Sequence, residues 1–261
     1  MLTLLLLFIT SLAVGFVSSI VGIGGGSILA PLLTLVFGYD VKVSIATTLL
    51  CTVVTSSSAS SVYLEKGLVN MKTALLLEPT TALGAITGAF ITIAIPSEVV
   101  KVVLAVVLLH LAIVMMYRAV NARSIGEGKG YELSLAPSIS LKRRILAVMI
   151  SFIAGMLSGM LGIGGGVIKV PLLVLVLGLP LKSAVATSSF MIGLTAAAGS
   201  MVYLLKGLIE PSLVIVMSSG IMPGAVLGAR TARRLKPRLL SPLLSSILFY
   251  AALRLLWSLA R

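Results

Sequence analysis

Long apolar runs separated by short polar loops make up nearly the whole chain. No run alternates polar and apolar side chains over about ten residues, as the strands of a membrane barrel do. Leu, Val, Ala and Met follow one another over lengths close to the roughly 20 residues that carry a helix across a bilayer. The pattern predicts an all-α polytopic membrane protein, with apolar runs at residues 2–20, 43–62, 73–95, 99–117, 145–161, 183–204, 212–229 and 239–257.

Two apolar stretches carry residues that weaken a helix. Residues 21–38 read VGIGGGSILAPLLTLVFG and residues 161–178 read LGIGGGVIKVPLLVLVLG. A glycine costs a helix interior about 1 kcal/mol and a proline about 3 kcal/mol, and irregular backbone inside a membrane must be surrounded by protein or line a wet cavity. Each stretch therefore predicts a hairpin, in which a glycine-rich turn leads into a half-helix of about 12 residues, too short to cross the bilayer comfortably.

The two stretches belong to a longer internal repeat. Gly22 recurs as Gly162 and Pro31 as Pro171, each 140 residues later, and the match runs without a gap over positions 15–88. Internal duplication is frequent among transporters. We expect two homologous repeats, each made of one glycine-tipped hairpin and three transmembrane helices, with the first at residues 1–120, a polar linker at 121–141 and the second at 142–261.

Basic residues bear on how the two repeats are oriented. The loop at 230–238 is rich in Lys and Arg, whereas its equivalent at 95–101 carries Lys101 alone. Equivalent loops of inverted copies lie on opposite sides of a membrane, and the side richer in basic residues is cytoplasmic. We therefore favour inverted repeats, with the basic loops 118–144 and 230–238 in the cytoplasm and the N-terminus outside. If each hairpin were one long broken helix, the copies would instead be parallel and the basic residues would divide almost evenly.

The composition agrees with a membrane protein. Of all residues 59% are hydrophobic and 10% are charged, with a mean hydropathy of +1.20, whereas a soluble domain has about 25% charged residues. The net charge of +13 comes mostly from short loops, so we expect a multi-pass protein of the plasma membrane and no nucleic-acid partner. The single cysteine, Cys51, excludes an internal disulfide and is expected to be a buried apolar residue.

The glycine-rich turns have the chemistry of an anion site. A short helix presents unsatisfied N–H groups and about half a positive charge where it begins, and glycine lets an anion approach that backbone closely. Inversion would bring the two turns together near the middle of the membrane. The alternative is that the glycines permit tight helix packing and that Ser and Thr link neighbouring helices. The predicted substrate-binding residues are Gly24, Gly25, Gly26, Ser27, Thr47, Thr48, Gly164, Gly165, Gly166, Lys169, Thr187 and Ser188, with Pro31 and Pro171 as structural residues.

Three lone polar residues interrupt the apolar runs. Lys169 stands where the first copy has Leu29; beside an anion site it would supply a counter-charge, and otherwise its ammonium would extend to the interface. Glu78, whose equivalent is Ser218, could carry a coupling proton, pair with a base such as Lys169, or face the interface. We take it as the candidate proton-coupling residue. His110 is expected to hydrogen-bond to a neighbouring helix rather than to relay protons.

These motifs resemble those of the TauE/SafE family of membrane permeases. GIGGGSILAPLL followed by ATT in the first copy, and GIGGGVIKVPLL followed by ATS in the second, are similar to that family's twin signatures. The resemblance covers nearly the whole chain and implies a permease, usually described as an exporter, for sulfite, sulfonates or other small anions. The family pattern does not require a lysine at position 169, so Lys169 would mark a substrate preference of this protein.

We therefore predict a secondary transporter, and not an enzyme, that binds sulfite, thiosulfate or an organosulfonate between the two GIGGG turns and alternates access by rocking of its halves. GIGGG lacks the G-K-[ST] ending of a phosphate-binding loop, and no metal-ligand pattern is visible in the sequence. We expect no cofactor and no metal, and coupling to an ion such as H⁺. The alternatives are an anion channel that uses the same site and a membrane subunit that delivers sulfur anions to a partner protein.

Overall fold

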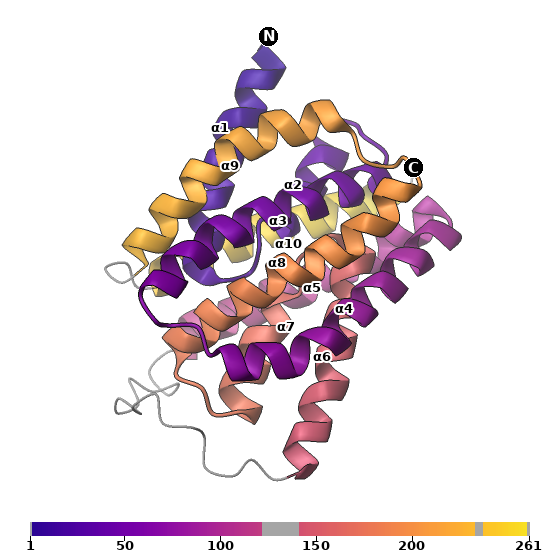
Figure 1. The fold of residues 1–261 in the computed structure, drawn as a ribbon. Helices are drawn as coiled ribbons and strands as arrows, with labels where there is room; N and C mark the ends of the chain where they lie inside the picture. The colour runs from indigo at the N-terminus through magenta and orange to yellow at the C-terminus, as the bar shows by residue number, and fades with distance from the viewer. Residues whose placement is uncertain (1, 122–140, 233–236, 260–261) are drawn as a thin grey trace.

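The computed structural model describes residues 2–121, 141–232 and 237–259, and within these ranges every regular element is helical. The all-α prediction is therefore confirmed, while the predicted linker at 121–141 lies almost wholly outside the described residues. In chain order the elements are α1 (Leu2–Val21), α2 (Gly26–Leu35), α3 (Val41–Glu65), α4 (Met71–Ala94), α5 (Ser97–Asn121), α6 (Leu141–Leu161), α7 (Gly166–Pro171), the π-helical turn η1 (Leu172–Val176), α8 (Leu181–Leu205), α9 (Pro211–Thr231) and α10 (Pro237–Leu259) (Figure 1).

Each of the eight predicted apolar runs lies inside one long helix, except that residue 95 falls one position beyond α4. Among the described residues, seven helices are long and apolar enough to cross a membrane, namely α1, α3, α4, α5, α6, α8 and α9. Polar residues set where two of them begin. The side chain of Asp40 accepts a hydrogen bond from the N–H of Lys42 at 2.8 Å ahead of α3, and Asn70 accepts one from Thr73 at 3.1 Å ahead of α4, as N-cap residues do.

The helices pack in reciprocal pairs. α1 lies against α9 and its equivalent α6 lies against α4, while α3 packs on its own equivalent α8 and α5 on α10. Small residues make the closest contacts, because a Cβ added at Gly220, Gly224 or Gly228 of α9 would overlap the backbone of α1 at residues 8–16. Positions rise together along α9 and α1, so these two helices run parallel. Such stripes of small residues let membrane helices approach closely.

Equivalent helices of the two copies run in opposite directions. Gly193 of α8 lies against Ser56 of α3, whereas Gly199, further along α8, lies against Leu49, which comes earlier in α3. α3 and α8 are therefore antiparallel, although they occupy equivalent positions in the two copies. This is the relation that inverted copies would have.

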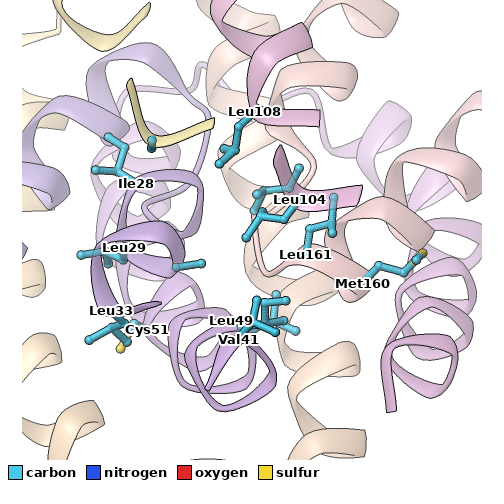
Figure 2. Close-up of a cluster of buried hydrophobic side chains, with 14 of the residues drawn as sticks. Ile28, Leu29, Leu33, Val41, Leu49, Cys51, Leu104, Leu108, Met160 and Leu161 are labelled. Atoms are coloured by element: carbon cyan, nitrogen blue, oxygen red, sulfur yellow. The ribbon is translucent and has the colours of Figure 1, made fainter. Parts of the chain in front are cut away.

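The two half-helices lie inside the bundle. α2 has 10 residues, about 15 Å at 1.5 Å per residue. Its apolar side chains Leu29 and Leu33 are fully buried in the main hydrophobic cluster, which also contains Cys51 (Figure 2). In the second copy α7 ends at Pro171 and the backbone continues as the π-helical turn η1. Pro31, the equivalent of Pro171, lies inside α2, which continues as a regular helix to Leu35, so the missing proline N–H does not by itself end the helix.

Candidate functional site

Two glycine-rich turns form the centre of the candidate site. We call residues 22–26 the first tip and residues 162–166 the second tip. A Cβ added at Gly26 would overlap the carbonyl oxygen of Gly162, and one added at Gly166 would overlap that of Gly22. The two tips therefore pack backbone to backbone through a reciprocal contact, and this contact requires glycine at both positions. All ten tip residues are buried.

The tip backbones carry N–H groups that no described residue accepts. The N–H groups of the first tip's Gly24, Gly25 and Gly26 make no hydrogen bond within the described ranges, nor do those of the equivalent glycines 164–166. Gly24 and Gly164 have φ of 72° and 77°, a region that favours glycine. The tips differ at one position, because Gly25 has φ of −69° whereas its equivalent in the second tip has φ of 68°.

Buried hydroxyls surround the tips. The side chains of Ser27, Ser158 and Ser188 are each fully buried and have no hydrogen-bond partner among the described residues. Ser158 lies next to Gly165, since a Cβ added there would come within 3.3 Å of the serine Cβ. The Thr48 hydroxyl also lies near the second tip, but it donates to the Ser44 carbonyl at 2.7 Å. Ser158 therefore has a free hydroxyl beside the second tip, Ser27 has one directly after the first tip, and Ser188 lies one turn after Val185, which contacts Gly22.

Thr47 and Thr187 each accept a hydrogen bond from the other copy. The Thr47 hydroxyl accepts the N–H of Glu210 at 3.2 Å, and the Thr187 hydroxyl accepts the N–H of Asn70 at 2.9 Å. Each bond joins one copy to the loop ahead of α9 or α4 of the other copy. These two hydroxyls link helices, as the alternative interpretation of the Ser and Thr residues holds.

Lys169 and Glu78 come together inside the protein. Lys169 is fully buried and Glu78 is 6% exposed, and the lysine Nζ lies 3.8 Å from the glutamate Oε2. Thr195 of α8 lies between them: Lys169 donates to its hydroxyl at 2.5 Å, and that hydroxyl donates to Glu78 Oε1 at 2.6 Å. Pairing was one of three possibilities for Glu78, and the structure shows this one. Neither residue reaches an interface in this arrangement.

The equivalent positions around the first tip carry no charges. By the 140-residue match, the equivalents of Lys169, Thr195 and Glu78 are Leu29, Thr55 and Ser218. Thr55 donates to the carbonyl of Cys51 at 3.0 Å, one turn before it in α3. The charged pair is therefore found beside α7, and its equivalent beside α2 is uncharged.

Several features of the site lie beyond the sequence prediction. Thr195 and Ser158 were not predicted, although both recur in the repeat, as Thr55 and Ser18, so the match between copies could have indicated them. The predicted hydrogen bond from His110 to a neighbouring helix is wrong, since His110 is exposed on α5 and no described residue hydrogen-bonds to it. A hollow of about 440 Å³ lies elsewhere, between the end of α2 and α10, and none of the predicted site residues lines it. No group of metal-ligating side chains exists in the described ranges.

Comparison with known proteins places the chain among membrane transporters. It is 27% identical to the probable membrane transporter protein YunE of Bacillus subtilis, over 97% of each chain. It is 28% identical to a probable membrane transporter protein of Methanocaldococcus jannaschii, over 95% of this chain and 93% of the relative. A sulfite exporter TauE/SafE family protein of Arabidopsis thaliana is 37% identical over 36% of this chain and 22% of its own.

No solved structure matches the chain significantly. The family described as sulfite exporter TauE/SafE matches residues 7–255, which is nearly the full length. With seven helices able to cross a membrane among the described residues, the chain is a multi-pass membrane protein, and it belongs to the TauE/SafE sulfite exporter family.

Proposed function

We propose that this protein is a secondary transporter of a small sulfur-containing anion, with sulfite, thiosulfate or an organosulfonate as its substrate, and that it is not an enzyme. The anion binds where the two tips meet, with the N–H groups of both tips as donors. Ser27, Ser158 and Ser188 add hydroxyl donors, and Lys169 supplies the opposite charge. The family to which the chain belongs supports the substrate class.

One observation carries this proposal: the reciprocal contact of the tips, with unpaired N–H groups on both. A buried N–H without an acceptor costs free energy comparable to a lost hydrogen bond. Several such groups on facing backbones, next to unpartnered hydroxyls, suit a ligand with several acceptor oxygens. Tight packing alone explains why Gly26 and Gly166 are glycines, but it does not explain why the N–H groups of the tips have no acceptor.

The packing of the tips favours a carrier over an open channel. Because each tip is covered by the other, an anion reaches the space between them only when one half moves relative to the other. The antiparallel relation of α3 and α8 supports inverted repeats, and transporters built this way rock one repeat against the other around a fixed site. In the proposed topology the basic loops 118–144 and 230–238 face the cytoplasm, and the N-terminus lies outside.

Thermal unfolding of the purified protein with sulfite, thiosulfate, sulfate or ethanesulfonate tests the binding site. A ligand at 100 times its Kd stabilises the folded state by about 2.7 kcal/mol, so we expect a clear shift with at least one of these anions. The double variant Ser27→Ala/Ser158→Ala should reduce that shift. Ser60→Ala is the matched control, because Ser60 is also buried with an unpartnered hydroxyl but lies two turns beyond Thr52 in α3.

Downhill flux of the stabilising anion from liposomes then tests transport. Reconstituted protein should release the anion at a saturable rate, whereas currents far above carrier turnover would favour the channel. Absence of stabilisation by any of the four anions would contradict the proposal and leave the glycines as packing residues.

A further inference from the structure

The positions equivalent to Lys169 and Glu78, around the first tip, hold the uncharged residues Leu29 and Ser218, and this asymmetry calls for an explanation. Leu29, the equivalent of Lys169, is fully buried in the hydrophobic cluster beside Leu33 and Cys51 (Figure 2). That position therefore folds without a charge. Placing a lysine in a membrane helix costs about 2.5–3.5 kcal/mol on insertion scales. Buried ion pairs are weak evidence for added stability, so the pair calls for a role other than holding the fold.

Lys169 is placed to exchange partners. It lies in the first turn of α7, and its backbone N–H donates to the carbonyl of Gly165 at 3.0 Å. Helical side chains point back toward the N-terminal turn, which here is the second tip. The backbone of the lysine whose ammonium pairs with Glu78 thus lies one turn from the proposed anion site. An anion at the tip competes with Glu78 for Lys169.

The electrostatic balance of the site then requires a proton. With Lys169 charged and Glu78 ionised the pair is neutral, and an arriving monoanion would leave one uncompensated negative charge away from water. Such a charge is costly, and buried ionisable groups neutralise instead. Protonation of Glu78 restores neutrality, because Lys169 then balances the anion.

Thr195 can satisfy both protonation states of Glu78. Its single hydroxyl proton points to Glu78 Oε1 at 2.6 Å, but the carbonyl of Met191 also lies 2.9 Å away. When Glu78 is protonated, its O–H can donate to the Thr195 oxygen while the threonine proton turns to Met191. The first copy shows this second arrangement, since Thr55 donates to the carbonyl of Cys51 at 3.0 Å. In the protonated state the proton is on Oε1, and Glu78 Oε2, which has no hydrogen bond within the described residues, remains the carbonyl oxygen of the carboxyl group.

No other described ionisable group competes for this role. Lys169 is the residue of α7 that faces Glu78. Thr195 is the residue of α8 that contacts it, and the titratable residues of α8 lie near the two ends of that helix. The basic residues of α6 are exposed in its first turn, as is Lys72 on α4 itself. The described ionisable groups on these elements are Lys169 of α7, Lys182 and Tyr203 of α8, and Lys142, Arg143 and Arg144 of α6.

We propose that each transported anion is accompanied by one proton, carried on Glu78, which releases Lys169 to bind the anion at the second tip. This inference rests on the proposed function and names its coupling ion. The proton bonds to a Glu78 carboxylate oxygen when the anion binds and leaves it when the anion departs. Transport of a monoanion is then electroneutral, whereas transport of a dianion moves one net negative charge.

Proton uptake on anion binding tests the inference directly. Thiosulfate and ethanesulfonate are the probes, because both stay fully ionised near neutral pH and contribute no proton of their own. Purified protein is mixed with each anion in weakly buffered solution with an indicator dye. We expect one proton taken up per anion bound, and binding that weakens as the pH rises.

Three variants make the test specific. Glu78→Gln should bind the anion with no proton uptake and with an affinity that no longer depends on pH. Lys169→Leu/Glu78→Ser recreates the residues of the first copy, so it should fold; it should bind the anion at least tenfold more weakly and take up no proton. The matched control Glu210→Gln removes a carboxylate in the loop ahead of α9 and should behave as the wild type.

The outcomes separate the two proposals. If the wild type binds neither probe, the proposed function is wrong for these anions and the coupling inference falls with it. If it binds an anion without taking up a proton, or if Glu78→Gln still takes one up, the function stands and the coupling inference is overturned.

Discussion

Tyr63 and Tyr203 make the same hydrogen bond in the two halves of the protein. The Tyr63 hydroxyl donates to the carbonyl of Ser19 at 2.7 Å, and the Tyr203 hydroxyl donates to the carbonyl of Gly159 at 2.7 Å. The two donors are 140 residues apart in the sequence, and so are the two acceptors. Each bond joins the last turns of α3 or α8 to the end of α1 or α6, directly before a tip, so the match between copies extends to the side chains that hold the tips.

Removal of either tyrosine hydroxyl should destabilise the protein to a similar extent. Tyr63→Phe and Tyr203→Phe each leave a buried carbonyl without its donor, at a cost of about 1–3 kcal/mol. The two sites share no partner, so the losses should add in the double variant. Unfolding in a denaturing detergent would measure them. A double variant no less stable than either single one would show that the two bonds are not equivalent parts of the fold.

The Lys169–Glu78 pair should behave as a unit in a double-mutant cycle. Lys169→Leu or Glu78→Ser alone leaves one buried charge without its partner and should cost about 3–5 kcal/mol. Lys169→Leu/Glu78→Ser removes both charges and should recover most of that loss, since an uncharged pair of this kind is tolerated in the first copy. The free energy of unfolding of all four proteins measures the coupling. Additive losses would mean that the two residues do not depend on one another.

Neighbouring glycines of the first tip should differ sharply in their tolerance of a methyl group. Gly25→Ala places a Cβ 3.3–3.5 Å from its nearest neighbours at an ordinary φ of −69°, so it should fold. Gly26→Ala drives a Cβ into the Gly162 carbonyl, and overpacking of this kind costs about 1–3 kcal/mol or more. The yield of monodisperse protein on size exclusion measures both. Equal yields would argue against the tight contact of the tips.

Accessibility labelling can test the inverted topology. Lys66 and Lys206 occupy equivalent positions after α3 and α8, so inverted copies place them on opposite sides of the membrane. In whole cells, an impermeant maleimide should label Lys206→Cys, on the outside, and spare Lys66→Cys until the cells are opened. Cys51 is buried and should not react in either variant. Labelling of both cysteines from the same side would indicate parallel copies.

Much of the fold could be predicted from the spacing of apolar residues. The run at 183–204 lies within α8, and the broken segments at 21–38 and 161–178 contain the two turns and half-helices. These features depend on local properties, namely the length of an apolar run and the conformational cost of glycine and proline. The repeat also indicated that the two tips would meet, because inversion of the two copies brings their equivalent turns together.

Side-chain partners were harder to predict, because they depend on how each helix is rotated about its axis. Thr47 and Thr48 are adjacent in α3, yet Thr47 accepts from the loop ahead of α9 while Thr48 bonds within its own helix. Thr195 was missed because nothing in its local sequence marks it as the bridge between Lys169 and Glu78. His110 shows the opposite error, since it was assigned a hydrogen bond to a neighbouring helix, but it is exposed and no described residue bonds to it.

The reciprocal contact of the tips also bears on how such a protein could have arisen. Each tip rests on backbone that only the other copy supplies, so half of the chain could not assemble this site by itself. An ancestor with a single repeat would have needed a second molecule of itself inserted the opposite way up in the same bilayer. Gene fusion would then have fixed the two orientations in one chain, and only after that could one half acquire a lysine and the other a glutamate.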